Sequence, residues 1–474
     1  MTALYETIAD HITEQIRSGV YAPGDRLPSV RRIKSDHGVS ASTAVEALRL
    51  LLDRNLAVNR PRSGYFVAKP RQSKPTRRVP QSRVDRSMQA RDLRTPLSLR
   101  LNLGIGNPQR PTLGAAVQGP ELMAVTAMNR LVSQAMRLNP VESHSYDAPP
   151  GSPDLRRALA RRAPAAGMEV APEEIVITSG AKEAVYLSIR AVTRPGDTVA
   201  IESPAYYALL EVLASLQLKV VEIPADPNRG IDLDSLAGVL DRHRIAAVAL
   251  VSNFSNPTGS CMTDEDKATL TSLLARKRVP LVEDDVYGDL AFEGHRPKAI
   301  KAFDRDGWVL HCSSHSKTVS PGMRIGWCVP GRFLNQVEHL KLVVNQATAT
   351  APQLALASFL DSGRFERHLR RIRPLFARQV DDMIAAVERH LPSDTRHTSP
   401  AGGHVLWLQV PGLDSLALYE EAASRGIHIA PGPLFSAGRR YLDCLRLNCG
   451  FAFTDETDAQ MAALGELITR QLDR

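Results

Sequence analysis

Lys317 lies in a run of small hydroxyl residues, and Arg324 follows it seven positions later. A lysine amine forms a Schiff base with an aldehyde once burial and a nearby cation lower its pKa. Arg324 and the hydroxyls of Ser314 and Ser316 are suited to holding a phosphate. The stretch therefore predicts pyridoxal 5′-phosphate as a cofactor, but similar runs occur in polar surface loops, so the prediction needs support from elsewhere in the chain.

Two further stretches offer a phosphate site and an aromatic face. Residues 177–184 are typical of a strand that enters a helix through a Ser-Gly turn, so the free backbone N–H groups of Ala181 and Lys182 can bind a phosphate. Tyr206 follows another apolar stretch and can stack on a pyridine ring, although a packed core tyrosine explains it equally well. Neither stretch, taken alone, is specific evidence for a pyridoxal-phosphate site.

Polar groups suited to a pyridine ring follow two more apolar stretches. Asn256 lies in Ser-Asn-Pro-Thr-Gly and can donate to the cofactor's 3′-oxygen, although a plain turn also explains it. In Glu-Asp-Asp-Val-Tyr, which ends at Tyr287, a carboxylate after an apolar strand is penalised unless it is paired. A carboxylate beside the pyridine nitrogen keeps that nitrogen protonated and makes the ring an electron sink. The residues alone leave Asp284 and Asp285 as alternatives for this role, and Tyr287 can share the 3′-oxygen.

The elements that must position these groups are short apolar strands that alternate with helical stretches. Strands that are apolar on both faces and separated by helices imply a mostly parallel sheet with helices on both sides. Functional residues are then expected where strands end and loops begin. The expected strands are residues 175–178, 198–201, 219–223, 246–251, 280–283 and 309–312.

Composition is typical of a globular protein with more than one domain: 474 residues, of which 43% are hydrophobic and 23% charged. No run approaches the length of a membrane span and the N-terminus lacks a signal-peptide pattern, so we expect a cytoplasmic protein without membrane association. The five cysteines are widely spread and contain no Cys-x-x-Cys pair. This pattern argues against a disulfide framework or a zinc site, and no metal is expected.

Positive charge is concentrated in the N-terminal fifth of the chain. Residues 1–98 contain 18 Lys and Arg against 9 Asp and Glu, a net of +9, whereas the remainder contains 41 against 42. A localised excess of this kind is the electrostatic footprint of a nucleic-acid-binding segment, although a solubilising tail has the same composition.

The basic region also has the pattern of a helix-turn-helix followed by a β-hairpin. Apolar residues recur at helical spacing from Leu4 to Ile16, and Ser29 and Ser40 are expected N-caps of two more helices. Residues 56–68 alternate around an Arg-Ser-Gly tip, which is typical of a hairpin wing. A small helical module without DNA contact is the alternative, and the basic charge favours DNA binding.

This region resembles the winged helix-turn-helix of GntR-type bacterial repressors, whose Pro-Gly-Asp-Arg-Leu-Pro-Ser-Val-Arg motif matches residues 23–31 and whose wing matches residues 60–67. The resemblance implies that the third helix enters the major groove of double-stranded DNA while the wing grips the backbone. Ala41 departs from the pattern, since relatives often carry arginine there, and a different operator preference follows. The expected DNA contacts are Ser29, Arg31, Ser40, Ser42, Thr43, Arg60, Arg62, Ser63 and Gly64.

The remaining motifs, in their order along the chain, resemble fold-type I pyridoxal-phosphate enzymes of the aminotransferase class I and II family over about residues 101–474. The resemblance implies an α/β fold with a mostly parallel sheet and a small α+β subdomain. It favours Asp284 over Asp285 because the family places this aspartate three residues before the tyrosine. By position it implies a Schiff base on Lys317, pyridine-nitrogen pairing by Asp284, 3′-oxygen contacts from Asn256 and Tyr287, stacking by Tyr206, and phosphate binding by Ala181, Lys182, Ser314, Ser316 and Arg324.

Two more positions match this family. Tyr146 matches the tyrosine that reaches the phosphate of the partner subunit, and Arg446 matches the arginine that clamps a substrate α-carboxylate in a bidentate pair. The departures are mild: His315 replaces a common aromatic residue, and Lys182 replaces a polar one. The resemblance thus implies that amino acids or similar carboxylates can enter the site.

Residues 70–98 are basic and punctuated by proline, and we interpret them as a flexible linker. The expected domains are therefore a winged helix-turn-helix at 1–69, the linker at 70–98 and an aminotransferase-like domain at 99–474. This architecture resembles that of MocR-type transcription factors, which are implied to act as head-to-tail homodimers that use the cofactor to sense an amino acid or amine effector. A working aminotransferase with a fused DNA-binding head is the alternative function.

Overall fold

The computed structural model describes residues 4–54, 56–60, 63–68, 88–89 and 112–474. The chain forms two compact units, one of which contains residues 1–75 and the other most of residues 76–474. Arg62 and most of the predicted linker lie outside the described residues, but Met88–Gln89 within that linker form strand β3 and pair with a strand of the second unit.

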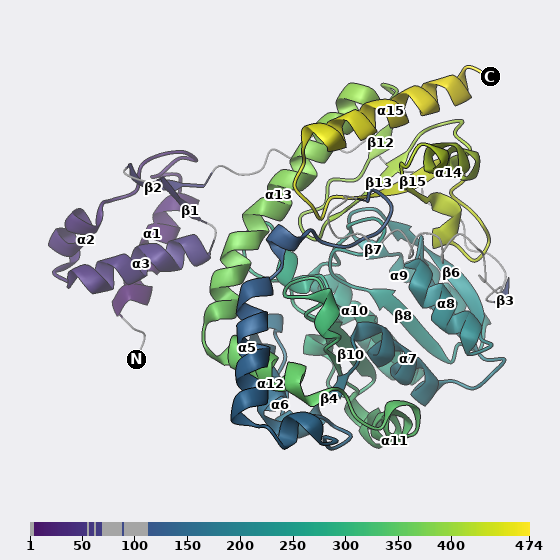
Figure 1. Cartoon of the computed structure of the whole chain (residues 1–474), viewed down its shortest axis with the longest axis horizontal. Helices are drawn as coiled ribbons and strands as arrows, with labels where there is room; N and C mark the ends of the chain where they lie inside the picture. The colour runs from purple at the N-terminus through teal and green to yellow at the C-terminus, as the bar shows by residue number, and fades with distance from the viewer. Residues whose placement is uncertain (1–3, 55, 61–62, 69–87, 90–111) are drawn as a thin grey trace. The chain divides into compact units, whose positions relative to one another are not determined.

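The first unit is the expected helix-turn-helix with a hairpin wing (Figure 1). Ser29 accepts a hydrogen bond from the backbone N–H of Arg32 and caps the second helix, which ends at Gly38 in the left-handed conformation. Its core contains the buried side chains of Ile8, Ile33 and Leu48. The elements are α1 (Leu4–Arg17), α2 (Val30–His37), α3 (Ala41–Asp53), β1 (Ala57–Arg60) and β2 (Gly64–Val67).

The second unit is built around a nine-stranded sheet whose path runs β3-β6-β5-β8-β9-β10-β11-β4, with β7 paired to β6. Neighbours from β6 to β10 are parallel, whereas β11 is antiparallel to both of its neighbours. The six expected strands are all present. The strands after β3 are β4 (Val176–Thr178), β5 (Thr198–Ser203), β6 (Lys219–Asp226), β7 (Gly230–Ile231), β8 (Ala247–Val251), β9 (Leu281–Asp284), β10 (Val309–Ser314) and β11 (Gly326–Val329).

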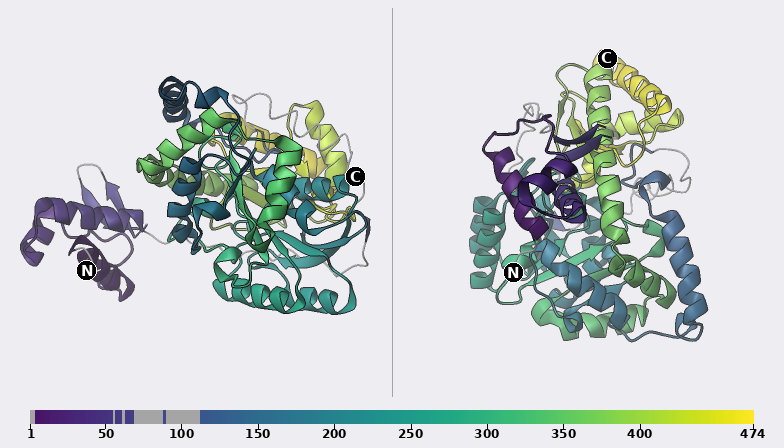
Figure 2. Two further views of the ribbon diagram at one scale, coloured as in Figure 1. Left: turned by 90° about the horizontal axis from the view of Figure 1, so that it is seen from below. Right: turned by 90° about the vertical axis from the view of Figure 1, so that its left-hand side faces the viewer.

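Successive residues of the central strands enter different cores, because a strand points alternate side chains to opposite faces. Val199 packs with one group of helices, and the adjacent Ala200 packs with another. Figure 2 shows helices on both faces of the sheet. The first group contains α7 (Ala181–Val192), α8 (Tyr207–Ser215) and α11 (Leu334–Asn345), and the second contains α9 (Leu233–Arg242) and α10 (Asp264–Lys277).

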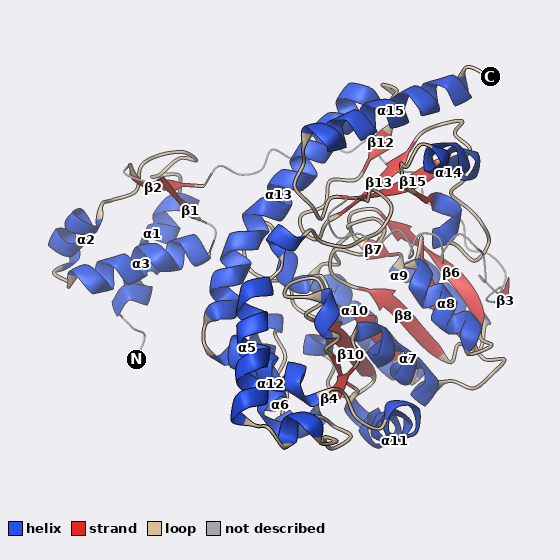
Figure 3. Cartoon of the chain, in the orientation of Figure 1, coloured by secondary structure: helices blue, strands red, loops and turns tan. Residues whose placement is uncertain are grey.

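A smaller antiparallel sheet follows the large one and has the order β12-β13-β15-β14 (Figure 3). It shares the largest core with the long helix α13 (Arg364–His390).

The described part of the chain contains no helix with the length and apolar character needed to cross a bilayer. The remaining elements are α5 (Val125–Leu138), α6 (Pro153–Arg162), α12 (Thr350–Asp361), β12 (Arg396–His397), β13 (Val405–Gln409), α14 (Ser415–Ser424), β14 (Ala430–Pro431), β15 (Cys444–Asn448) and α15 (Asp455–Leu472).

Candidate cofactor site and DNA-binding unit

A cavity of about 170 Å³ lies at the ends of the parallel strands in the second unit. Ligands bind at this edge of open α/β sheets because the loops that follow the strands converge there. The predicted cofactor residues, from segments far apart in the sequence, gather around it with the exception of Tyr146. Those that line the cavity are Ala181, Lys182, Tyr206, Asn256, Asp284, Tyr287, Ser314, Ser316, Lys317 and Arg324.

Lys317 is held just beyond the end of β10 with its amine in this cavity. Burial, together with the charge of Arg446, lowers the pKa of Lys317 to about 8. Nζ donates a hydrogen bond to the carbonyl oxygen of Ala116 at 2.6 Å. An amine with this pKa has a substantial neutral fraction near neutral pH, as attack on an aldehyde requires.

Asp284 ends β9 and is half-buried at the wall of the cavity. Its Oδ1 has no hydrogen-bond partner among the described residues, and burial raises the pKa of the carboxyl to about 7, with a contribution from Asp285. An unsatisfied buried carboxylate oxygen that faces a cavity is suited to a ligand that brings its own positive N–H. A pyridine nitrogen fits this requirement.

Both carboxylate oxygens of the neighbouring Asp285 already accept hydrogen bonds from protein groups. Oδ1 accepts from Asn253 Nδ2 at 2.9 Å, and Oδ2 accepts from Arg296 Nη2 at 2.6 Å. Asp285 does not line the cavity. The tertiary structure thus separates the two aspartates that the residue pattern alone left as alternatives, and it places Asp284 at the cofactor cavity.

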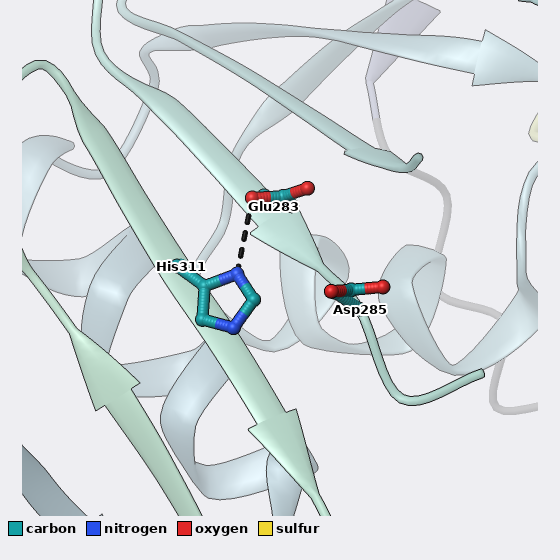
Figure 4. A group of neighbouring side chains, drawn as sticks. All are labelled: Glu283, Asp285 and His311. Carbon is teal, nitrogen blue, oxygen red and sulfur yellow. Dashed lines mark hydrogen bonds and ion pairs between the residues drawn. The ribbon is translucent and has the colours of Figure 1, made fainter. Parts of the chain in front are cut away.

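Glu283, Asp285 and His311 form a buried cluster beneath the site (Figure 4). Burial works against ionisation of Glu283, but the hydrogen bond from His311 Nδ1, at 3.1 Å, and the charge of His311 lower the pKa of Glu283 below its ordinary value. Glu283 Oε1 also accepts from Ser252 Oγ at 2.5 Å and from the backbone N–H of Ile300 at 2.7 Å. Because these oxygens already have donors, we interpret the cluster as support for the strand ends and not as a metal site.

Tyr287, Asn256 and Arg446 form a chain of polar contacts beside the cavity. Asn256 Nδ2 lies 3.5 Å from the hydroxyl oxygen of Tyr287, and Arg446 Nη1 donates to Asn256 Oδ1 at 3.0 Å. Burial raises the pKa of Tyr287 above its usual range. The hydroxyl therefore keeps its proton and can donate it to an oxygen of a bound ring.

The N-terminus of α7, where the phosphate is predicted to bind, forms one end of the cavity. Gly180 has φ of +89° and caps this helix, which leaves the first backbone N–H groups without helical partners. A Cβ on Gly326 of β11 would lie 2.4 Å from the carbonyl carbon of Gly180, so only glycine allows this close approach. Arg324 Nη2 donates to the carbonyl oxygen of Ser179 at 3.0 Å and adds positive charge beside the turn.

The sequence patterns of two families match the chain: "Bacterial regulatory proteins, gntR family" over residues 4–67, and "Aminotransferase class I and II" over residues 101–463. The HTH-type transcriptional regulator YdcR of Escherichia coli K12 is 37% identical over 99% of both chains. The chain belongs to the MocR-type regulators of the GntR family. YjiR, an HTH-type transcriptional regulator of the same strain, is 34% identical to this MocR-type chain, again over 99% of both.

The second unit of this MocR-type regulator has the fold of solved aminotransferases. Kynurenine aminotransferase of Pyrococcus horikoshii, solved in complex with PMP, is 28% identical with a TM-score of 0.74. The match covers 80% of this chain and 95% of that one. The family and its fold indicate pyridoxal phosphate as the cofactor. The unpaired Oδ1 of Asp284, the lowered pKa of Lys317 and the free first turn of α7 fit this group, which supplies an electron sink when bound.

Tyr146 is 82% exposed and does not line the cavity of its own chain. A tyrosine that served the site of the same subunit would be buried against it. The exposed position is compatible with the predicted role toward a partner subunit.

The predicted DNA contacts of this MocR-type chain that are among the described residues lie at helix starts and on the wing. Ser40 caps α3 by accepting from the backbone N–H of Thr43, and its Oγ is also 2.7 Å from Ser42 Oγ. Arg60 packs over the ring of Phe66 at 4.4 Å from the ring centre. The residues that are exposed are Ser29, Arg31, Ser40, Ser42, Arg60 and Ser63, whereas Thr43 and Gly64 are half-buried.

Arg26 is exposed beside the wing and was missed by the sequence analysis, although it lies within the quoted GntR motif. Its Nη2 is 3.5 Å from the position that a Cβ would take at Gly64. A guanidinium at the base of the wing adds to the positive surface there. The GntR motif could have identified Arg26 as a candidate DNA contact, because arginine is the fourth residue of that motif.

His404 is a second missed residue, beside Tyr287. Asn448 Nδ2 donates to the carbonyl oxygens of Thr112 and Val117, so Asn448 Oδ1 accepts the hydrogen on His404 Nδ1 at 3.0 Å. Burial, together with the charge of Lys317, lowers the pKa of His404 to about 3. The ring is therefore neutral. No local pattern predicts that His404 is buried and neutral beside Tyr287, because this environment depends on strands β13 and β15 being adjacent.

Proposed function

We propose that this regulator binds pyridoxal 5′-phosphate through Lys317 and uses it to sense a small effector with an amino or carboxylate group, which alters its binding to promoter DNA. The observation that carries the proposal is the Oδ1 of Asp284, which is shielded from solvent and has no partner among the described residues, in the same cavity as a lysine with a lowered pKa. A chain that had lost cofactor binding would gain stability by replacing such a carboxylate with an apolar residue.

The proposed roles of the site residues follow their positions. Lys317 holds the cofactor covalently, Asp284 pairs with the ring nitrogen, and Asn256 and Tyr287 contact the 3′-oxygen. Tyr206 lies against the ring, and Arg446 receives the effector carboxylate. The phosphate is bound by Ala181, Lys182, Ser314, Ser316 and Arg324, with Tyr146 reaching the partner's site.

We propose that the functional assembly is a head-to-tail homodimer in a bacterial cytoplasm, where its DNA is found. Exposed apolar side chains near Tyr146 support a subunit interface, since Leu138 is 64% and Val141 76% exposed. The proposed boundaries are a DNA-binding domain at 1–69, a linker at 70–98 and the cofactor domain at 99–474. Two DNA-binding domains in one assembly suit a two-part operator.

The test is an absorbance titration of the full-length protein loaded with pyridoxal phosphate, with a panel of amino acids and amines. Binding to its own upstream DNA is followed in the same samples by fluorescence anisotropy. We expect one ligand to change both the visible absorbance and the DNA affinity. If no visible band forms with added pyridoxal phosphate, the sensing function is excluded.

A working aminotransferase is the second candidate, because Lys317, Asp284, Tyr287 and Arg446 suffice for the chemistry. The two functions differ in what an amino acid does. Steady turnover in the presence of a keto acid indicates an enzyme, whereas a single spectral change coupled to DNA affinity indicates a sensor.

A further inference from the structure

Residues Thr112–Gln118, which we call the strap, run along the candidate effector site. Leu113 is 1% and Ala115 2% exposed, so the strap is packed into the second unit and not lying on its surface. Its carbonyl oxygens accept hydrogen bonds from two cationic side chains of the site, Lys317 and Arg446. Ala116 O accepts from Lys317 Nζ, and Gly114 O accepts from Arg446 Nη2.

The contact with Arg446 occupies part of the group that would bind an effector. Arg446 is fully buried, its Nη1 donates to Asn256, and its Nε has no partner among the described residues. A carboxylate pairs best with a guanidinium through two parallel N–H groups. While Gly114 O accepts from Nη2, one of the N–H groups that a carboxylate would use on Arg446 is already occupied.

The strap is anchored by residues that flank the two cations. The backbone N–H of Asn448, two residues after Arg446, donates to Leu113 O at 2.8 Å, and Asn448 Nδ2 donates to Val117 O at 2.9 Å. Gln118 Nε2 donates to the carbonyl oxygen of Ser316 at 2.5 Å, next to Lys317. Displacement of the strap from Arg446 therefore loosens contacts along its whole length.

We propose that the strap is an internal competitor for the effector carboxylate: its Gly114 carbonyl holds Arg446 until a carboxylate takes that place and releases the strap. This inference rests on the proposed function, which assigns the effector carboxylate to Arg446. Strand β3 (Met88–Gln89), upstream of Thr112, pairs with β6, so release of the strap is a change within the second unit.

The test is hydrogen–deuterium exchange of the full-length protein, with and without cofactor, read by mass spectrometry on peptides that cover residues 112–122. Succinate is the probe, because a carboxylate without an amine engages Arg446 and cannot react with the cofactor. We expect succinate to increase exchange in the strap of the wild-type protein. In Arg446→Ala the strap should exchange fast from the start and ignore succinate.

A matched pair of variants tests the competition itself. Gln118→Ala removes the anchor to Ser316, and its control, Gln379→Ala, makes the same change at an equally buried position in α13. Loss of one buried hydrogen bond should raise the affinity for succinate about fivefold in Gln118→Ala and leave it unchanged in Gln379→Ala. Equal or weaker succinate binding in Gln118→Ala, or no binding to any of these proteins, would overturn the proposal.

The outcomes also separate this inference from the proposed function. If the DNA affinity responds to an effector while exchange in the strap stays constant, the strap proposal is wrong and the sensing function stands. If succinate releases the strap and no effector changes the DNA affinity, the strap proposal is supported and the sensing function is the part that fails.

Discussion

Asp284 and Asp285 are adjacent in the chain, yet only Asp284 faces the cofactor cavity, while Asp285 forms a buried ion pair with Arg296 at 2.6 Å. Strand geometry explains the difference, because successive side chains at the end of β9 point to opposite faces. One carboxylate is left for a ligand, and the other holds the surrounding loops.

Asn substitutions at these two positions should affect different properties, cofactor binding at Asp284 and stability at Asp285. Asp284→Asn should fold and weaken cofactor binding, because it removes the anionic partner of the ring nitrogen. Asp285→Asn should destabilise the protein by about 2 kcal/mol, because it removes one of the two carboxylates paired with the buried Arg296, the other being Asp289. Urea unfolding and the visible spectrum of the loaded protein measure the two effects, and the reverse pattern would assign the roles the other way.

The raised pKa of Asp284 also predicts how the stability of the cofactor-free protein varies with pH. The folded pKa of about 7 lies above the ordinary value of 3.8, so ionisation is more costly in the folded state. The resulting destabilisation should develop between about pH 4 and pH 7 and be complete above pH 7. Unfolding curves of Asp284→Asn should lack this component, and an identical pH dependence in both proteins would contradict the assignment.

Cofactor association should follow the ionisation of Lys317. Only the neutral amine attacks an aldehyde, and a pKa of about 8 predicts a rate that rises with pH up to about 8 and then levels off. Stopped-flow absorbance after mixing cofactor-free protein with pyridoxal phosphate measures this profile. Lys317→Ala should give no covalent product, and a borohydride-reduced adduct found by mass spectrometry in that variant would show that another lysine reacts.

Arg446→Ala should retain the cofactor and lose the response of DNA binding to carboxylate effectors. The side chain contacts Asn256 and Gly114 but does not line the cofactor cavity, so the cofactor spectrum should be nearly unchanged. Arg446→Lys keeps the charge without the bidentate fork and should respond only weakly. An intact response in Arg446→Ala would place the effector elsewhere.

Alanine substitutions at Ser40 and Ser42 should distinguish a residue that caps a helix from one that contacts DNA. Ser40 accepts from the backbone N–H of Thr43, so Ser40→Ala should destabilise the first unit by about 1 kcal/mol. Ser42 is exposed and is not the cap, so Ser42→Ala should keep the stability and weaken DNA binding. Thermal unfolding and DNA titrations at fixed salt distinguish the two, and unchanged affinity in Ser42→Ala would remove it from the interface.

Local patterns of the sequence predict much of the fold and much of the candidate site. Leu4 to Ile16 recur at helical spacing, Gly38 ends α2 in the left-handed conformation, and the apolar runs are the strands β4, β5, β6, β8, β9 and β10. These signals act between near neighbours, through backbone conformation and the period of each element. The motif that contains Lys317 also predicts its chemistry, because a strand end, small residues and an arginine occur within one short stretch.

The environment of each side chain was decided only by the tertiary structure. Arg446 contacts Asn256 and Gly114, which are 190 and 332 residues away in sequence. The neutral His404 and the unpaired oxygen of Asp284 likewise depend on which strands and loops are adjacent. Burial, desolvation and competition for hydrogen bonds are properties of contacts between distant segments. Local sequence therefore determined which groups are present, and folding decided which of them are paired and which remain for a ligand.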